Sequence, residues 1–286
     1  MEEELEVRRL GWAGIQLTFD NHDLVIDLFE ERNAFAPFIE EVTGELPPPS
    51  GPVDVALVTH LHADHTDPGA IGRSLKPGGR VFRPDPAPGD DLDRASTMKA
   101  EMGLAELDAE IEVAELWETQ VAGPFEITAV PAVDGFGDPQ FSWVVEAGDH
   151  RIFHGGDTVF HGGFWPIASR FKPFDAVFLP VNGAACNFPH RQPPSPYPVV
   201  LTPEKAAVAA VMLGAELAVP IHYNGIDEPG LYEPVADAAE RFTAVAADDE
   251  PDTIIAALGP KMLRLAAAET QGAHPYFSPV EHTAYA

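Results

Sequence analysis

The stretch DVALVTHLHADHTD, residues 54–67, ends an apolar run in a cluster of three histidines and two aspartates. Residues 53–58 are mainly aliphatic and β-branched, which predicts a short buried strand. Pro68, directly after the cluster, is suited to the first position of a helix. The polar cluster is therefore expected in a loop that joins a strand to a helix.

The spacing inside this cluster favours a metal site over a solvated polar loop. Residues two apart in extended backbone point the same way, so His60 and His62 can present their rings to one cation. Asp64 and His65 follow where the chain turns, and they can face a second cation nearby. Imidazole and carboxylate ligands suit zinc, iron or manganese, and two adjacent ions suit hydrolysis.

The pattern H-x-H-x-D-H after an apolar strand resembles the signature of the metallo-β-lactamase superfamily. LGWAGIQLTFDNHDLVIDLF (residues 10–29) is similar to the first hairpin of that family, with Asp27 in the place of its buried aspartate. RIFHGGDTVF (residues 151–160) resembles the strand that supplies a metal-bridging carboxylate, which falls on Asp157. AELAVPIHY (residues 215–223) resembles the strand that presents the last histidine, which falls on His222. The resemblance implies an α/β (α+β) fold, the four-layer αββα metallo-β-lactamase sandwich.

One ligand of the family pattern is missing. The third histidine is expected in ITAVPAVDGFGDPQFSWVV (residues 127–145), where this chain offers Asp134. One interpretation is that Asp134 replaces the histidine. The other is that Asp134-Gly135 forms only a turn, and Asp138 is a weaker second candidate. A carboxylate is a harder ligand than an imidazole, so Asp134 as a ligand would favour manganese or iron relative to zinc.

The resemblance also implies a complete metal site and a hydrolytic mechanism. The expected metal ligands are His60, His62, Asp64, His65, Asp134, Asp157 and His222. They would hold two divalent metal ions, with zinc expected first and manganese or iron as alternatives. Asp64 would be the catalytic residue that transfers the proton of the attacking water. We therefore expect a metal-dependent hydrolase that acts on a small-molecule ester, lactone or phosphodiester.

The loop LPVNGAACNFPHRQPPSP (residues 179–196) follows a strand that should end beside the metals. Asn182 and His190 are its candidate substrate contacts, with Arg191 next to them. Together with LTPEKA and LGAELAVPIHY, this loop is similar to the ascorbate-6-phosphate lactonase-like branch, which implies hydrolysis of cyclic esters or phosphorylated small molecules. Ala184 stands where we expect a basic residue for a phosphate, which argues against a phosphorylated substrate.

Two other classes of function stay open. A di-iron redox protein of the same fold is the first, since a carboxylate in place of a histidine suits iron. A metal-binding module with a degenerate first site is the second. A serine or cysteine nucleophile is not indicated, because no G-x-S-x-G motif occurs and Cys186, the only cysteine, has no identifiable base.

Composition and charge indicate which partners and which environment suit the protein. The 286 residues carry a formal charge of -29, which disfavours nucleic-acid backbone and anionic membranes as partners. The charge also suggests adaptation to high salt, with lysine depletion in a GC-rich genome as the alternative. No apolar run reaches the length of a membrane span, and the acidic start is unlike a signal peptide, so we expect a cytoplasmic protein. A homo-oligomer is left open.

The expected elements alternate in two halves. We predict one domain over residues 1–265 and a loosely held tail over 266–286. Strands are expected through much of residues 5–54 and then at 53–58, 111–118, 125–131, 141–146, 151–154, 173–181 and 217–223, and residues 254–265 are expected to end the domain. Helices are expected at residues 90–103, 202–215 and 232–246, the second capped by Thr202 with Pro203 at its first position.

Overall fold

The computed structural model describes residues 4–36, 38–39, 42–247, 254–255 and 272–273. The chain divides into two compact units, Met1–Thr243 and Ala244–Ala286. In the second unit, β15 (Ile254–Ile255) pairs in parallel with β16 (Gly272–Ala273). The predicted domain end at residue 265 and the start of the tail lie outside the described residues and stay predictions.

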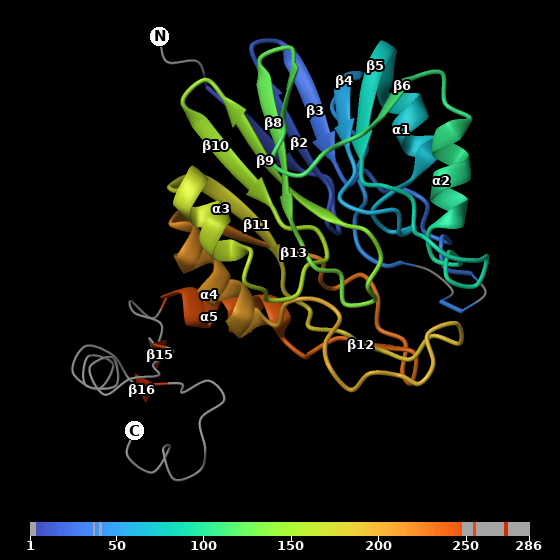
Figure 1. Cartoon of the computed structure of the whole chain (residues 1–286), viewed down its shortest axis with the longest axis vertical. Coiled ribbons are helices and arrows are strands. Elements are labelled where there is room, and N and C mark those ends of the chain that lie inside the picture. Colours follow the sequence, from blue (N-terminus) through green and yellow to red (C-terminus); the bar gives the residue numbers. More distant parts are fainter. Residues whose placement is uncertain (1–3, 37, 40–41, 248–253, 256–271, 274–286) are drawn as a thin grey trace. The chain divides into compact units, whose positions relative to one another are not determined.

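The first unit contains two six-stranded sheets that face each other (Figure 1). The first sheet consists, in spatial order, of β1 (Glu6–Arg9), β2 (Ile15–Phe19), β3 (His22–Ile26), β4 (Val53–Leu57), β5 (Leu75–Arg83) and β6 (Glu110–Val113). Its first three strands are antiparallel neighbours, and the pairs from β3 to β6 are parallel.

The second sheet repeats this arrangement. In spatial order it consists of β13 (Ala215–Ile221), β11 (Phe174–Pro180), β10 (His150–His154), β9 (Phe141–Ala147), β8 (Phe125–Pro131) and β7 (Thr119–Ala122). Strands β7 to β10 are antiparallel neighbours, and β10, β11 and β13 are parallel. A short antiparallel pair, β12 (Ala185–Cys186) with β14 (Tyr232–Glu233), lies in the loops.

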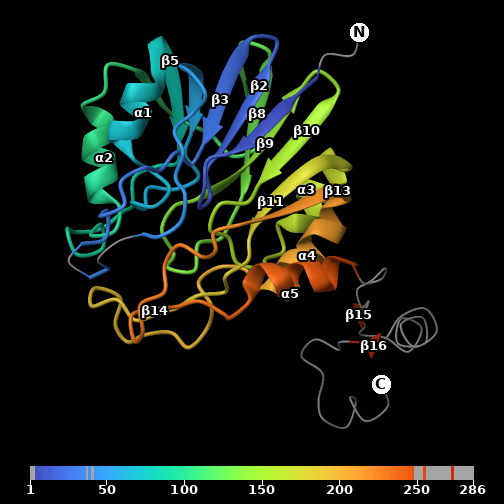
Figure 2. The same cartoon turned by 180° about the vertical axis from the view of Figure 1, so that it is seen from behind.

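Helices cover the outer face of each sheet (Figures 1 and 2). On the first sheet, Ile71 of α1 (Pro68–Ser74) and Leu104 of α2 (Met98–Ala105) share a buried cluster with Val25 and Ala56. On the second, α4 (Pro203–Leu213) packs on β11 and β13 and contacts α3 (Phe164–Phe171), and α5 (Ala238–Ala247) follows later. The expected four-layer αββα sandwich is confirmed.

The main core lies between the two sheets. One buried cluster joins side chains of the first sheet to side chains of the second, among them Leu17, Val55, Phe82, Ile127, Trp143 and Phe178. In strand β8, the alternate residues Phe125, Ile127 and Ala129 belong to this core, and Glu126 between the first two is exposed. Burial of one face of each sheet fixes the register of the strands, and with it the positions of the loops at their ends.

Helix starts were predictable from the sequence. Asp67 caps α1 by accepting a hydrogen bond from the Ala70 amide, and Pro68 occupies the first turn. Thr202 caps α4 in the same way, accepting from the Lys205 amide. The predicted helix start at Pro68 and the predicted cap Thr202 are confirmed, whereas the cap Asp67 was not predicted.

Four predicted elements were wrong in extent. The helix expected over 90–103 begins only at Met98, because Asp90 Oδ1 accepts hydrogen bonds from the amides of Leu92 and Asp93 and holds a separate turn. The helix expected over 232–246 begins at Ala238, since Tyr232 pairs with Cys186 in β14. The strand predicted over 111–118 ends at Val113. Strands were also predicted through much of residues 5–54, but β3 ends at Ile26 and the connection from there to residue 52 holds no described strand.

Among the described residues, no helix is both long enough and apolar enough to cross a lipid bilayer.

Candidate metal centre

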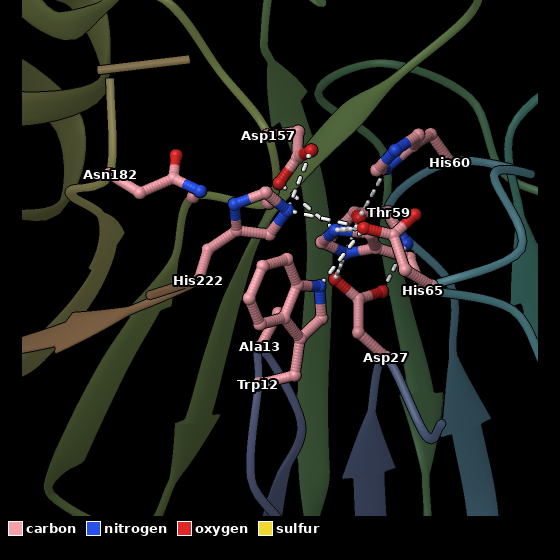
Figure 3. Close-up of polar contacts among 12 residues, drawn as sticks. Trp12, Ala13, Asp27, Thr59, His60, His65, Asp157, Asn182 and His222 are labelled. Atoms are coloured by element: carbon pink, nitrogen blue, oxygen red, sulfur yellow. Dashed lines mark hydrogen bonds and ion pairs between the residues drawn. The ribbon is translucent and has the colours of Figure 1, made fainter. Parts of the chain in front are cut away.

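The candidate ligands follow the carboxyl ends of strands in both sheets. His60, His62, Asp64 and His65 come after β4. Asp157 follows β10, and His222 follows β13 with a positive φ of 58° that turns its side chain out of the strand direction. The two sheets thus bring residues about 160 positions apart in sequence into one buried cluster (Figure 3).

Four of these residues form the tighter group. Ligand atoms of Asp64, His65, Asp157 and His222 all lie within 4.8 Å of one another, and all four residues are buried. Asp157 connects the two imidazoles, with its Oδ1 at 2.9 Å from His65 Nε2 and its Oδ2 at 3.0 Å from His222 Nε2. This is the group that the sequence assigned to the second ion, with Asp157 between the two ions.

Several of these atoms are buried without a hydrogen-bond partner. Among the candidate ligands they are His60 Nε2, His222 Nδ1, His65 Nε2 and Asp157 Oδ1. The last two are only 2.9 Å apart, yet they are not aligned as donor and acceptor. Buried polar atoms are normally paired, and unpaired nitrogen and oxygen atoms that converge on one space fit a bound cation. The residues present therefore fit the metal ions that the sequence predicts.

Asp27 sets the orientation of two histidines. Its Oδ2 is 2.7 Å from His65 Nδ1, which must donate to it, so a neutral His65 carries its lone pair on Nε2. The same carboxylate accepts the Thr59 hydroxyl at 2.8 Å. Thr59 Oγ1 therefore accepts from His60 Nδ1 at 3.0 Å, which leaves Nε2 of His60 as its lone-pair nitrogen. A buried carboxylate behind each ring is a typical support for metal-binding histidines.

His62 belongs to a second group beside the first. Its ring is 4.3 Å from the His60 ring between centroids, and its ligand atom lies within 4.8 Å of atoms from Asp134 and Asp138. Asp138 Oδ2 is 2.8 Å from His62 Nε2 and accepts a further hydrogen bond from Arg191 at 2.6 Å. If His62 Nε2 donates to Asp138, Nδ1 is left for a cation. Asp138 thus orients His62, a role that differs from the ligand role considered for it.

Asp134 combines features of both interpretations. It lies buried next to His62, and its backbone bridges to Thr158, the residue after Asp157. Its Oδ2 accepts the amide of Asp138 at 2.9 Å, as a turn aspartate does. Gly135 passes so close to Val199 that a Cβ would meet backbone atoms at 2.3 Å, which fixes the turn. The amide of Phe136 also donates to this carboxylate, so the turn holds Asp134 in place beside His62.

The buried histidines and carboxylates of the site shift one another's pKa values. Burial lowers the pKa of His60 well below its usual value, and His65 and His62 add to this. Burial acts the same way on His65, but Asp157, Asp64 and Asp27 outweigh it and raise the pKa of His65 well above its usual value. Burial raises the pKa of the Asp134 carboxyl. Burial acts against the charge of Asp157 as well, but His222 and His65 outweigh it and lower the pKa of Asp157 well below its usual value. Protonated histidines thus compensate the buried carboxylates, and a cation bound among them would displace these protons.

Two other histidines near the motif have structural roles. His154 is buried, and its Nε2 donates to the carbonyl of Ala13 at 2.8 Å, while its Nδ1 accepts the Gly156 amide. His161 Nδ1 accepts the Gly163 amide ahead of α3. These contacts give both histidines a structural role.

A pocket of about 390 Å³ opens next to the metal ligands, with His62, Asp64 and Asp157 in its wall. His190 lines it as expected for a substrate contact, and its Nε2 is 2.8 Å from Ser96 Oγ. Asn182 does not line this pocket. Its side chain is buried and donates from Nδ2 to the Tyr232 hydroxyl at 2.9 Å, so the pocket residue is Tyr232 and Asn182 holds it.

Sequence reasoning missed several residues at the site. Tyr232 was assigned to a helix, and Phe136 and Phe188 had no assigned role, although all three line the pocket. Trp12 donates from Nε1 to Asp64 Oδ2 at 2.9 Å and packs against His222. Trp12, Phe136 and Phe188 lie in stretches that resemble the family, but no pattern assigns them a role, and only the contacts between distant loops show it.

Comparisons with known proteins agree with this geometry. Residues 25–223 match the family described as Beta-lactamase superfamily domain. A UPF0173 metal-dependent hydrolase of Thermococcus onnurineus is 22% identical over 258 residues, which cover 85% of this chain and 93% of that protein. The metallo hydrolase Igni18 of Ignicoccus hospitalis has a similar fold, with a TM-score of 0.58, 18% identity and coverage of 84% and 90%. CmlA, a diiron β-hydroxylase of Streptomyces venezuelae, has a TM-score of 0.56 at 16% identity, with coverage of 78% and 45%.

Proposed function

The chain belongs to the beta-lactamase superfamily as a metal-dependent hydrolase, and we propose that it hydrolyses a small-molecule ester, lactone or phosphodiester at a two-metal site. His60 and His62 would hold one ion, with Asp134 as its third ligand. Asp64, His65 and His222 would hold the other, and Asp157 would lie between them. Zinc is the first expectation, and Asp134 favours a share of manganese or iron.

The observation that carries this proposal is the set of buried atoms without hydrogen-bond partners. His60 Nε2, His65 Nε2 and Asp157 Oδ1 are three such atoms, and Asp27 leaves Nε2 as the lone-pair nitrogen of both rings. A polar core that served only stability would pair these atoms with one another. Their arrangement supports cation binding instead.

Two divalent ions, when bound, supply positive charge that makes a water more acidic and stabilises the anion formed on the substrate. The chain's own residues accept the proton of the water and donate a hydrogen bond to the substrate. Trp12 and His222 hold Asp64 by its Oδ2, so its other oxygen is available to take the proton of the attacking water. Tyr232 accepts a hydrogen bond from Asn182, which leaves its own hydroxyl hydrogen to donate to a substrate oxygen.

Burial raises the pKa of Tyr232 well above its usual value, and Asp157, Cys186 and Asp64 add to the effect. The hydroxyl therefore stays protonated at neutral pH and can act as a donor. We place Tyr232 beside the substrate, with Asn182 as the residue that positions it.

The finer expectations from the sequence extend this proposal. They are a lactonase-like activity, a cytoplasmic location, a small-molecule substrate without nucleic-acid or membrane partners, and a possible homo-oligomer. The loop after β11 and the acidic composition support them. The substrate itself is set by the pocket beside the metal ligands.

A di-iron redox protein is the second candidate, favoured by the three carboxylates Asp64, Asp134 and Asp157 among the candidate ligands. Such a protein would consume dioxygen and need an electron donor. A hydrolase needs only water. Hydrolysis that persists without oxygen and without a reductant therefore distinguishes the two functions.

The direct test is His62→Ala, with metal content and hydrolysis measured on the same preparation. His62 is expected to hold one ion, so the variant should lose metal and activity together. The control is His22→Ala, because His22 lies at the start of β3, lines no part of the pocket and is not a candidate ligand. Full activity in His62→Ala, or an equal loss in His22→Ala, would remove the proposed mechanism.

A further inference from the structure

We propose that the pocket beside the candidate metal centre selects a neutral ester or lactone that carries an apolar chain or ring, and that it disfavours phosphodiesters and other anionic substrates. This inference rests on the proposed hydrolase function and narrows its substrate class. It follows from the shape of the pocket wall and from the charges along it.

One wall of the pocket is a row of aromatic rings that begins at a metal ligand. The Phe136 ring stands edge-on to His62 at 5.8 Å between centroids, and Phe188 follows at 5.7 Å from Phe136. Tyr232 lies 6.5 Å from Phe188, and His190 stacks on Phe188 at 5.8 Å. An apolar group bound along this row would have its reacting carbonyl at the His62 end, next to the metals.

Residues 34–36, 38 and 39, in the loop after β3, also line the pocket. Phe35, Phe38 and Ile39 line it, and Phe38 is 52% exposed although it is a large apolar side chain. Exposed aromatic side chains that face a cavity are typical of ligand pockets. The volume of about 390 Å³ lies in the range of small-molecule sites.

The pocket offers an anion no free positive side chain among the residues described as lining it. Lys99 is the one cation there, and both Glu31 oxygens lie at 2.9 and 2.8 Å from its Nζ. Arg191, next to His190, is paired with Asp138 at 2.6 Å. Burial and the neighbouring Arg191 lower the pKa of His190, so its ring is neutral at neutral pH. Phosphate recognition normally uses arginine or lysine side chains or a helix N-terminus.

The first experiment compares three γ-lactones with the metal-loaded enzyme. They are γ-butyrolactone, γ-decalactone, and a γ-lactone with the same six-carbon tail ending in a carboxylate. Each buried methylene should raise kcat/KM about fourfold until the pocket is full. We therefore expect γ-decalactone to exceed both of the others at least about tenfold. Equal rates for all three, or a preference for the carboxylate-ended tail or for bis(4-nitrophenyl) phosphate, would overturn the inference.

A variant locates the preference in the aromatic row. Phe188→Ala should lower the ratio of kcat/KM for γ-decalactone to that for γ-butyrolactone by about tenfold, mainly through KM. Phe171→Ala is the matched control, because Phe171 is also half-buried but lies on α3 and does not line the pocket. An unchanged ratio in Phe188→Ala, or an equal fall in Phe171→Ala, would contradict the inference.

Binding separates this inference from the proposed function. The probes are 5-hexyl-2-pyrrolidinone, the lactam counterpart of γ-decalactone, and 2-pyrrolidinone, both measured by calorimetry on the same protein. Tighter binding of the hexyl lactam, lost in Phe188→Ala, supports the apolar pocket even if no lactone is hydrolysed, in which case only the proposed function fails. Hydrolysis without any such difference in binding leaves the proposed function standing and overturns the inference.

Discussion

Asp134 is the residue on which the metal preference depends. Its carboxylate is buried, and burial raises the pKa of this group, so ionisation at neutral pH costs folding free energy unless a cation lies beside it. The turn that includes Gly135 nevertheless holds it next to His62. A cation bound beside Asp134 would offset the free energy that its ionised carboxylate costs in this buried position.

The burial of this carboxylate predicts that Asp134→Asn stabilises the metal-free protein and weakens metal binding. Because the pKa of Asp134 is raised in the folded state, the protein loses stability as pH rises through that pKa. Removing the charge should therefore raise the melting temperature of the chelated protein at neutral pH. The same change should weaken metal binding, because a neutral amide is a poorer ligand. The gain in melting temperature should shrink as pH falls and the wild-type carboxyl becomes protonated.

Melting curves of chelated and metal-loaded protein test this prediction, with Asp85→Asn as an exposed control. A turn residue without a metal role would leave the metal affinity of Asp134→Asn unchanged. That result would leave the first ion to His60, His62 and Asp157.

Tyr232→Phe tests the proposed hydrogen bond to the substrate. Loss of one such donor should lower kcat by about a hundredfold with a small change in KM. The variant also leaves Asn182 Nδ2 without its acceptor, which should cost about 1–3 kcal/mol of stability. Kinetics well below the melting temperature separate the two effects, and Tyr197→Phe, at an exposed tyrosine, is the control. An unchanged kcat would show that Tyr232 only lines the pocket.

Sequence reasoning went furthest where ligands share a motif. His60, His62, Asp64 and His65 are close in sequence, and Asp157 and His222 stand in stretches that resemble a known pattern, so their convergence could be expected. The contacts of Tyr232, Phe136 and Asp138 could not be expected, because they depend on how loops from different strands meet. Asn182 shows the limit well, since its buried amide supports a neighbour instead of facing the pocket.

At the scale of elements, local signals decided which predictions held. Strands β8 and β9 and helix α4 have clear apolar patterns or caps, and they appear close to their predicted bounds. Strand β5 was not predicted, because Pro77, Gly78 and Gly79 interrupt its pattern. Helix α3 was missed as well, since it has only eight residues and includes Pro166. Pairing with neighbours in the sheet, which no local pattern records, stabilises β5.

Helix α1 carries a prediction of its own, because its start follows the metal motif directly. Asp67 Oδ1 accepts the Ala70 amide and Oδ2 accepts the Glu30 amide, which ties the helix to the loop after β3. Asp67→Ala should therefore lower the free energy of unfolding by about 1–2 kcal/mol. Urea denaturation measures this, and Asp85→Ala on an exposed loop should change it by less than about 0.5 kcal/mol. A loss for Asp67→Ala no larger than that of the control would show that the cap contributes little.

At the scale of the whole molecule, the net charge of -29 is the dominant feature. Acidic side chains crowded on one surface repel each other, and about 1 M salt shortens the screening length to about 3 Å. We therefore expect the melting temperature to rise from low salt to about 1 M potassium chloride. A flat or falling melting temperature over this range would argue for lysine depletion without adaptation to salt.

The central claim is that the carboxyl ends of strands from two sheets assemble one two-metal hydrolytic site. The most direct measurement is the metal content per chain, by elemental mass spectrometry, of protein purified without added metal and again after chelation and reloading. The account predicts two divalent ions per chain in the loaded protein, with hydrolysis lost on chelation and recovered on reloading. A chain that binds no divalent ion, or that hydrolyses its substrate equally well after chelation, would contradict it.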